Sequence, residues 1–321
     1  MIYQIKNGSI VEIDPVMSSV EKFYEKYVPD QSLIIFDGVK LNNTEISSDI
    51  TYLIYDDATN PVDVNRHLAE LDLSGRSCII TGLYHYHRNP HTNPKIKFFP
   101  FWAIWMSYQN YQFSSKPKKY KISCLNGIPR EHRKLVYVRL QEKEYFSDMI
   151  FTFGHRPGFH QNFDNWELTE QEKQKFDLLP QNVEFIPEDQ NGIDITINHP
   201  AFQETYINLV TETTVRADIP MLSEKSFKPI IAGQLFILIA SPGAIQFLRD
   251  IGIDTFDDII DHSYDYISDT RTRIEQALIQ VNHIVHKDLS HIYEIIKPRL
   301  VKNSRYLLSQ EFRNQFPLNF G

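Results

Sequence analysis

The sequence predicts an α/β protein with a mostly parallel sheet. Short apolar runs that end in polar residues recur along the chain and are typical of buried strands. They lie at 33–36, 52–55, 78–80, 120–124, 149–153, 206–210 and 235–240. Segments with helical spacing lie at 16–27, 62–71 and 130–140, and the aromatic stretch 98–106 is expected to hold a strand and a helix start. Strands that alternate with helices favour parallel pairing through crossovers.

Length and composition describe a globular protein. The 321 residues favour one large α/β unit or two domains, and 42% hydrophobic with 23% charged residues is an ordinary globular balance. No apolar run approaches the ~20 residues that a membrane helix needs. The first 14 residues, MIYQIKNGSIVEID, lack a basic region followed by an apolar core, so no signal peptide is predicted. We expect a cytoplasmic protein of a bacterial or viral-host cell, with Cys78 and Cys124 as buried free thiols.

Charge is unevenly distributed along the chain. The formal net charge of −8 argues against a general nucleic-acid binder. Residues 116–139 nevertheless carry one acid, Glu131, against a run of basic residues: Lys116, Lys118, Lys119, Lys121, Arg130, Arg133, Lys134 and Arg139. Such a local basic patch could serve a diphosphate, and it could also contact a nucleic-acid backbone.

Two domains are expected. The polar stretch 112–119, QFSSKPKK, resembles a linker, which gives an N-terminal domain at 1–115 and a C-terminal domain at 116–321. Residues 154–200 are polar and irregular, and we expect an insertion over a cleft. Residues 270–316 are expected to form two long helices broken near Pro298.

The stretch 206–242 organises the C-terminal half. An apolar strand is followed by Thr211-Glu212-Thr213, and the carboxyl ends of strands are where open α/β sheets collect ligand-binding groups. Ser223 is a good N-cap, which places Glu224 and Lys225 in the first turn of the next helix. Lys225 could bind a diphosphate there and Glu224 could accept hydrogen bonds from a ribose. Alternatively, Glu224 only interacts with the helix dipole and Lys225 is solvated.

A second candidate lies in the turn NGIPREHR, residues 126–133. Arg130 and Arg133 are three residues apart, so they share a helix face just after a predicted strand that ends at Asn126. Arginine forks match phosphate oxygens, so both are candidates for binding phosphate groups. The alternative is a solvated or salt-bridged helix start.

One segment carries a resemblance to a known family. It reads LSEKSFKPIIAGQLFILIASPGAIQFLRDIGIDTFDDIIDHSYD. It resembles glycosyltransferase-like proteins of phages, giant viruses and bacteria, whose pattern is roughly [ST]-E-K-[ST]-x-K-P-I-x-x-G-x-P-F-[IV], then P-G, L-R-x-[LI]-G-[FI]-x-T-F and D-x-S-Y-D. The E-K core is also similar to the donor-site motif of α1,3-fucosyltransferases, which have the GT-B fold. The resemblance covers 123–273, and an N-x-x-x-R-x-x-R pattern recurs in that family at 126–133. Gln234-Leu235 departs from the pattern, where the family often has a small residue and proline.

The resemblance implies a GT-B-like fold, in which two Rossmann-like domains face a cleft and the last helices cross back to the N-terminal domain. It implies transfer of a sugar from a nucleotide-sugar donor to an acceptor hydroxyl, without a metal and without a cofactor other than the donor. The donor-binding set would be Asn126, Arg130, Arg133, Glu212, Ser223, Glu224 and Lys225. The acceptor class stays open among a glycan, a protein and a modified base in phage DNA. The alternative is a non-catalytic carbohydrate- or nucleic-acid-binding protein on a degenerate version of the fold. The motif DHSYD, 261–265, is interpreted as structural.

A catalytic base is expected from the N-terminal domain, because an inverting transfer needs one near the acceptor hydroxyl. Asp37, Asp57 and His85 lie at predicted strand ends and are the candidates, with Asp56 and His87 beside them. His85 and His87 alternate and would share one strand face. A metal site would need a third ligand such as His91, and this weak spacing leads us to predict no metal. The same segment could be a stacking surface for an acceptor.

Overall fold

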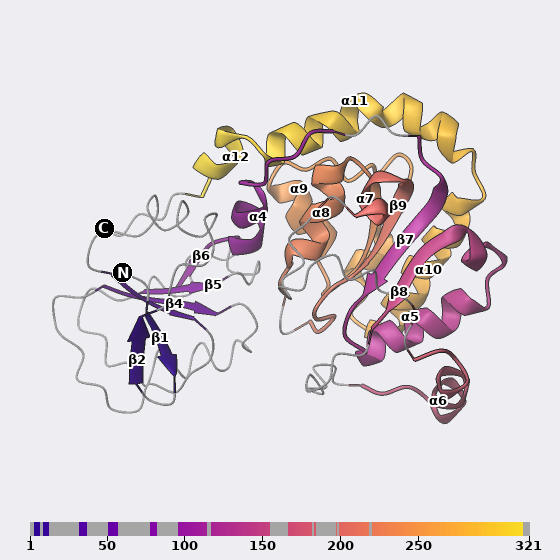
Figure 1. The fold of residues 1–321 in the computed structure, drawn as a ribbon, viewed down its shortest axis with the longest axis horizontal. Helices are drawn as coiled ribbons and strands as arrows, with labels where there is room; N and C mark the ends of the chain where they lie inside the picture. Colours follow the sequence, from indigo (N-terminus) through magenta and orange to yellow (C-terminus); the bar gives the residue numbers. More distant parts are fainter. Residues whose placement is uncertain are drawn as a thin grey trace. The chain divides into compact units, whose positions relative to one another are not determined.

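The structure is a computed structural model and describes the residues named here. In the first 95 residues it describes the backbone of five strands, at 3–6, 9–12, 32–36, 51–56 and 78–81, and it then describes residues 96–113, 117–154, 166–181, 183, 197, 199–217 and 220–316. The chain divides into two compact units, one of residues 1–109 with 310–321 and the other of residues 110–309 (Figure 1). The two-domain assignment with its boundary at 115 stays a prediction, since 114–116 are not among the described residues.

The first unit contains a parallel sheet. Its strands pair in the order β3 (Ser32–Phe36), β4 (Thr51–Asp56), β5 (Cys78–Thr81) and β6 (Ile96–Phe98), and every pair is parallel. This confirms the predicted strands at 33–36, 52–55 and 78–80. An antiparallel pair, β1 (Tyr3–Lys6) and β2 (Ser9–Glu12), was not predicted. The helices expected at 16–27 and 62–71 lie outside the described residues.

The end of the chain lies in this first unit. Helix α4 (Phe101–Met106) follows β6, as the stretch 98–106 predicted, and α12 (Gln310–Asn314) belongs to the same unit. Arg313 of α12 donates a hydrogen bond to the Ser107 carbonyl at 2.7 Å and packs 4.7 Å from the centroid of the Tyr108 ring. These contacts join α12 to the end of α4.

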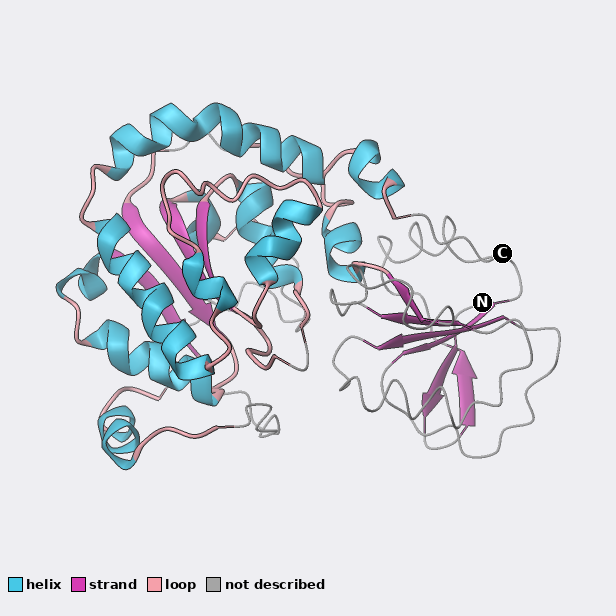
Figure 2. Cartoon of the chain, turned by 180° about the vertical axis from the view of Figure 1, so that it is seen from behind, coloured by secondary structure: helices cyan, strands magenta, loops and turns pink. Residues whose placement is uncertain are grey.

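The second unit is an α/β domain built on a four-stranded parallel sheet. Its strands are β7 (Tyr120–Asn126), β8 (Met149–Phe153), β9 (Thr205–Thr211) and β10 (Leu235–Ile239), paired in the order β10-β9-β7-β8. Every residue of β10 is buried, so helices cover both faces of this sheet (Figure 2). The described helices are α5 (Glu131–Gln141), η1 (Glu144–Asp148), α6 (Glu170–Asp177), α7 (Pro200–Gln203), α8 (Glu224–Ala232), α9 (Ala244–Asp250), η2 (Ser263–Tyr266), α10 (Thr270–Val285) and α11 (Leu289–Leu307).

The strand order reverses at β7. The chain passes from β7 through α5 to β8 on one side, then returns to β9 on the other side and continues through α8 to β10. Helix α8 packs against β9 and β10 together with α7 and α11, whereas α10 packs against β10 and α5. The connections after β7 and β9 therefore diverge, and such a topological switch point is where open α/β sheets bind ligands.

Aromatic packing fixes α5 on the sheet. The Tyr137 ring of α5 lies 4.6 Å from the Phe151 ring and 5.1 Å from the Phe153 ring, centroid to centroid, and both phenylalanines come from β8. Burying rings of this size is the largest single contribution that side chains make to a core. The position of the first turn of α5 therefore depends on a buried aromatic cluster.

The two long helices predicted near the end of the chain are present as α10 and α11, but the predicted break at Pro298 was wrong. Pro298 lies inside the continuous helix α11, and the break occurs at 286–288, where Asp288 accepts a hydrogen bond from the backbone N–H of His291 at 3.0 Å as an N-cap.

The described part of the stretch 154–200 contains a helix, α6, with a complete capping box between Thr169 and Glu172, where we expected irregular structure. An insertion over a cleft stays a prediction. None of the described helices combines the length and the apolar character needed to cross a membrane.

Candidate functional site

The carboxyl ends of β7, β8 and β9 are bonded together by short polar side chains. The Thr211 hydroxyl donates to Asn126 Oδ1 at 2.5 Å, and the Asn126 backbone N–H donates to the Thr152 hydroxyl at 3.1 Å. Beyond β8 the backbones approach so closely that a Cβ at Gly154 would lie 2.9 Å from the Gly127 carbonyl oxygen. Asn126 is 1% exposed and therefore connects β7 to β8 and β9 inside the sheet, at its switch-point edge.

The first turn of α5 is bonded to the end of β9. Arg133 Nη2 donates to the carbonyls of Thr211 at 3.1 Å and Glu212 at 3.0 Å, and His132 Nε2 donates to the same Glu212 carbonyl at 2.9 Å. Arg130 Nη1 donates to the Thr213 carbonyl. Burial, followed by repulsion from Arg130, lowers the pKa of the Arg133 guanidinium to about 10, so it stays charged near neutrality. Both arginines thus hold backbone while adding positive charge.

The first turn of α8 begins as predicted. Ser223 is the N-cap, and its Oγ accepts a hydrogen bond from the Lys225 backbone N–H at 3.4 Å. Lys225 Nζ donates to Glu224 Oε1 at 2.6 Å, and makes longer contacts of 3.3 Å with Ser223 Oγ and 3.4 Å with Thr213 Oγ1. The Lys225 side chain is 31% exposed and that of Glu224 is 14% exposed. Lys225 is thus the more accessible of the pair.

The Glu224 carboxyl is held ionised by its neighbours. Burial alone would raise its pKa, but the ammonium groups of Lys225 and then Lys228 outweigh burial and hold the pKa below its ordinary value. Lys228 itself is 5% exposed and lies 5.9 Å from the centroid of the Phe202 ring. The start of α8 therefore carries a charged cluster even without a ligand.

Glu212 connects the end of β9 to the start of α8. Its Oε1 accepts from the Ser223 backbone N–H at 2.9 Å and from Ser226 Oγ at 2.6 Å, and its Oε2 accepts from Ser223 Oγ at 2.7 Å and the Thr213 backbone N–H at 2.9 Å. The residue is fully buried. A carboxylate offers about four lone-pair positions, and all of them are used here.

Cationic side chains gather at this edge. Among the described residues they are Arg130, Arg133, Lys225 and Lys228, and the carboxylates beside them are Glu212 and Glu224. Because the first turns of α5 and α8 also present the positive ends of helix dipoles, the edge can attract an anion.

The prediction of one basic patch over 116–139 was wrong. Lys118 to Lys121 lie at the amino end of β7, whereas Arg130 and Arg133 follow its carboxyl end. A strand of this length separates them by roughly 20 Å. Several of the remaining cations are ion-paired: Lys119 with Glu204 at 2.9 Å, Lys134 with Glu131 at 2.6 Å, and Arg139 with Glu172 and Glu275 at 2.7 and 2.8 Å.

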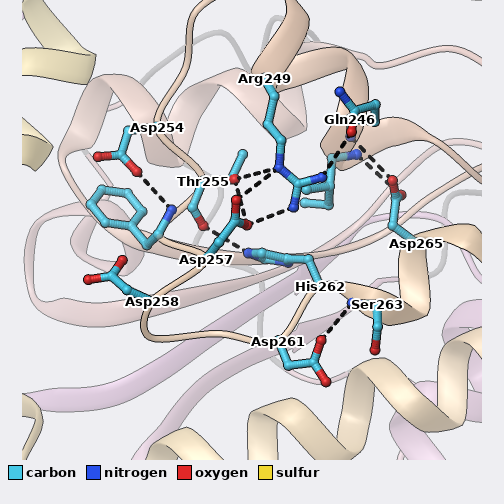
Figure 3. Close-up of polar contacts among 12 residues, drawn as sticks. Gln246, Arg249, Asp254, Thr255, Asp257, Asp258, Asp261, His262, Ser263 and Asp265 are labelled. Atoms are coloured by element: carbon cyan, nitrogen blue, oxygen red, sulfur yellow. Dashed lines mark hydrogen bonds and ion pairs between the residues drawn. The ribbon is translucent and has the colours of Figure 1, made fainter.

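The motif DHSYD supports β10 and the start of the helix that follows it. Both oxygens of Asp265 accept from backbone N–H groups at the start of α9, Ile245 and Gln246, each at 3.2 Å (Figure 3). The Tyr264 hydroxyl accepts from the Leu238 backbone N–H at 3.2 Å, inside β10. Asp261 accepts from the Ser263 backbone N–H at 2.9 Å and stabilises the turn itself.

The structure brings the predicted donor-binding residues together at one edge of the sheet: Asn126, Arg130, Arg133, Glu212, Ser223, Glu224 and Lys225. The predicted catalytic residues Asp37, Asp57 and His85 lie outside the described residues, as does His87. Within the part of the chain that the structure describes, no group of three or more His, Cys, Asp and Glu side chains is arranged to hold a metal ion. Cys124 is a buried free thiol, and burial raises its pKa to about 12.

Sequence reasoning missed two participants at this edge. His132 stands between the two arginines, and Ser226 follows the residues that were singled out at the start of α8. Ser226 occupies the third position of α8, where a hydroxyl can reach back to a carboxylate that precedes the helix. The repeated serine in Ser223-Glu224-Lys225-Ser226 was the available signal.

The fold and the site define the second unit as a doubly wound α/β domain with a cationic edge at its switch point. No protein-family model and no curated protein matches the chain. Over 89% of its length the chain is similar to solved structures of a DNA-modifying enzyme, beta-glucosyltransferase, with and without uridine diphosphoglucose (14% identity, 80% of that chain, TM-score 0.41). It is likewise similar to T4 phage BGT with UDP and Mn²⁺ (13%, 81%, 0.42) and to a T4 phage BGT mutant with UDP-glucose (12%, 81%, 0.38).

Proposed function

We propose that this protein is a glycosyltransferase that binds the diphosphate of a nucleotide-sugar donor at the switch-point edge of its second unit. The observation that carries the proposal is that the first turns of α5 and α8 are bonded to the same end of β9, with Arg130, Arg133 and the partly exposed Lys225 at that edge. The S-E-K pattern and the N-x-x-x-R-x-x-R pattern of the resembling family fall on these two turns.

Each group at the edge has a chemical task in this proposal. Lys225 is partly exposed, bonded to Glu224 at 2.6 Å and in longer contact with Ser223 and Thr213. In this proposal its ammonium also contacts the diphosphate and neutralises the charge that grows as the glycosidic bond breaks. The guanidinium groups of Arg130 and Arg133 add positive charge near the diphosphate, while their N–H groups donate to the carbonyls of Thr213 and Thr211 at the end of β9. Glu224 accepts a hydrogen bond from the ribose. This division of tasks requires no metal ion.

The acceptor and the base that activates it stay open. Asp37, Asp57 and His85 are the candidates for the base, and the acceptor classes are a glycan, a protein and a modified base in DNA. A non-catalytic binding protein is the alternative function, and it would keep donor affinity without turnover.

The test combines thermal denaturation with calorimetry. A panel of UDP-, GDP-, ADP- and CMP-sugars is added to the full chain, with and without a chelator, at about 100 times the dissociation constant where binding is found. A ligand at that excess stabilises by about 2.7 kcal/mol, which corresponds to a rise of several degrees in melting temperature. At least one nucleotide sugar is expected to bind with chelator present. If none binds, the proposal is overturned, and if binding requires a divalent cation, its metal-independent form is wrong. Release of free sugar or nucleoside diphosphate over time separates an enzyme from a binding protein.

A further inference from the structure

The carboxylate of Glu212 has no position left for a ligand. Each of its oxygens accepts one backbone N–H and one serine hydroxyl, all between 2.6 and 2.9 Å. A ribose hydroxyl could bind there only by displacing one of these donors, and the displaced buried donor would cost free energy. Glu212 is therefore saturated by the protein itself.

The saturated carboxylate fixes the direction of the Ser223 hydroxyl. That hydroxyl has one proton, which it donates to Glu212 Oε2 at 2.7 Å. Its lone pairs are then directed at the Lys225 backbone N–H, 3.4 Å away, and at Lys225 Nζ, 3.3 Å away. Through one hydroxyl, Glu212 determines what the ammonium of Lys225 can contact.

The main chain of the same residue holds the other side of the site. The Glu212 carbonyl accepts from Arg133 Nη2 at 3.0 Å and His132 Nε2 at 2.9 Å, both in the first turn of α5. One residue thus connects the starts of α5 and α8, which carry the charges that would bind a diphosphate.

We propose that Glu212 is a positioning residue for the diphosphate site, and that it acts through Ser223 on Lys225 instead of contacting the nucleoside. This inference rests on the proposed function, because it assigns Lys225 to a diphosphate. It differs from a donor-contacting role for Glu212 in one measurable respect. A positioning residue affects any diphosphate, whereas a residue that contacts ribose affects only ligands that contain ribose.

The decisive variant is Glu212→Gln. Both carboxylate oxygens accept from a backbone N–H, so the amide NH₂ faces a backbone donor whichever way the side chain is turned. The substitution is nearly isosteric and removes one acceptor together with the charge. The probe is inorganic pyrophosphate, which has two phosphates and no ribose, and the measurement is calorimetry on the full chain. We expect at least about a tenfold loss of pyrophosphate affinity.

The matched control is Glu172→Gln. Glu172 is also a buried carboxylate with several donors, but it lies on α6 and bonds to Arg139 and Arg271. We expect it to lower the melting temperature without changing pyrophosphate affinity. Ser223→Gly is the second variant in case Glu212→Gln does not fold, since glycine is tolerated at an N-cap but lacks the hydroxyl that connects Glu212 to Lys225. The loss of pyrophosphate affinity in Ser223→Gly should equal that in Glu212→Gln.

A double-mutant cycle with Lys225→Ala separates positioning from general destabilisation. If Glu212 acts through Lys225, then Glu212→Gln costs little further affinity once Lys225 is absent. Equal costs in both backgrounds would overturn the inference, as would a loss confined to nucleoside diphosphates with pyrophosphate binding unchanged. Failure of the wild-type protein to bind any diphosphate would instead overturn the proposed function and the inference with it. Wild-type binding together with unchanged binding by Glu212→Gln and Ser223→Gly would overturn the inference alone.

Discussion

The imidazole of His262 and the hydroxyl of Tyr264 are joined by a 3.1 Å hydrogen bond whose direction is fixed by their other partners. His262 Nε2 lies 2.8 Å from the Thr255 carbonyl, which can only accept, so Nε2 carries the proton of the neutral ring. Nδ1 then accepts from Tyr264, and the Tyr264 oxygen accepts from the Leu238 N–H. With a neutral ring, every donor in this series of hydrogen bonds meets an acceptor. A protonated ring would instead present an N–H donor to both Tyr264 and Thr255.

This arrangement predicts a pH dependence of stability. Burial lowers the pKa of His262 below its ordinary value of 6.5, although the Thr255 carbonyl and Asp257 oppose the shift. The unfolded chain therefore binds the proton first, so the contribution of His262 is complete above about pH 6.5 and is lost as pH falls toward the folded pKa, at up to about 1.4 kcal/mol per pH unit. Denaturation at pH 7.5 and 5.5 measures it. His262→Gln should show a smaller loss between the two pH values than the wild type, and an equal loss would contradict the prediction.

Lys225→Ala is expected to reduce transfer about a hundredfold. The ammonium offsets charge that is larger in the transition state than in the bound donor, so the loss should appear in kcat as well as in donor affinity, at about 3 kcal/mol. Stability should change by no more than about 0.5 kcal/mol, because the side chain is partly exposed and Lys228 still faces Glu224. Lys297→Ala is the control, since that lysine is 38% exposed and pairs with Glu294 on α11. If Lys225→Ala turned over the donor at the wild-type rate, Lys225 would not be the group that neutralises the diphosphate.

Glu172 is expected to hold α6 in place. Its Oε1 accepts from Arg139 at 2.7 Å and Arg271 at 2.6 Å, and its side chain is 7% exposed. Burial would raise its pKa, but its backbone bond to Thr169 and the two guanidinium groups lower the pKa to about 2. Its contribution is therefore complete above about pH 4.5 and is lost as pH falls toward 2.

Glu172→Gln should destabilise by about 1–2 kcal/mol, because it removes the charge that the partly exposed Arg139 and Arg271 share, although Arg139 keeps its bond to Glu275. Trp166 gives a local readout, since the Arg271 guanidinium lies 5.1 Å from the centroid of its ring. Its fluorescence should change with the variant and not with Glu170→Gln, whose carboxylate pairs with Lys173 and is 81% exposed.

Gly233→Ala is expected to be strongly destabilising. Gly233 ends α8 with a φ of +68°, and a Cβ there would lie 1.9 Å from Cε2 of Phe113. The left-handed conformation costs a non-glycine residue roughly 1–2 kcal/mol, and the clash adds to it. Urea denaturation of Gly233→Ala and of Gly233→Ala with Phe113→Ala separates the two contributions. Recovery of full stability in the double variant would show that backbone conformation contributes nothing.

The sheet of the second unit was predictable because its strands are buried on both faces. Burial of that kind requires continuous apolar runs, and 149–153 and 235–240 stand out from their surroundings for this reason. The start of α8 was equally local, since a serine at the N-cap is a signal within one turn. The antiparallel pair β1 and β2 also had a local signal, Asn7-Gly8 between two alternating segments, which is a typical hairpin sequence.

The continuity of α11 could not be predicted from local rules, because tertiary bonds from the residues that follow Pro298 override the proline. Arg299 is paired with Asp254 and Asp258 at 2.7 and 2.8 Å, and Ser304 Oγ donates to the Ile231 carbonyl at 2.6 Å. A proline in a helix interior costs about 3 kcal/mol, which contacts of this kind can offset. Asp288 was the correct marker of the break.

The candidate site was predictable in its residues and not in their contacts. Sequence spacing placed Arg130, Lys225 and Glu224 at helix starts, which is where the structure has them. The serine partners of Glu212 are 11 and 14 residues further along the chain, across a loop of no regular periodicity. No local pattern can assign a carboxylate to hydroxyls at such distances, so its saturation by protein donors required the fold.

The central position of β7 has a consequence for the order of folding. Its neighbour β9 begins about 80 residues later in the chain, since Ser123 is paired in register with Asn208. The charged edge therefore cannot assemble until this long loop has closed, and long-range parallel pairing of that kind is slow. In a chain emerging from the ribosome, α5 and β8 would exist well before the residues that Arg133 must contact. Refolding followed by pulse-labelled hydrogen exchange should show the amides of β7 that face β9 becoming protected after those that face β8.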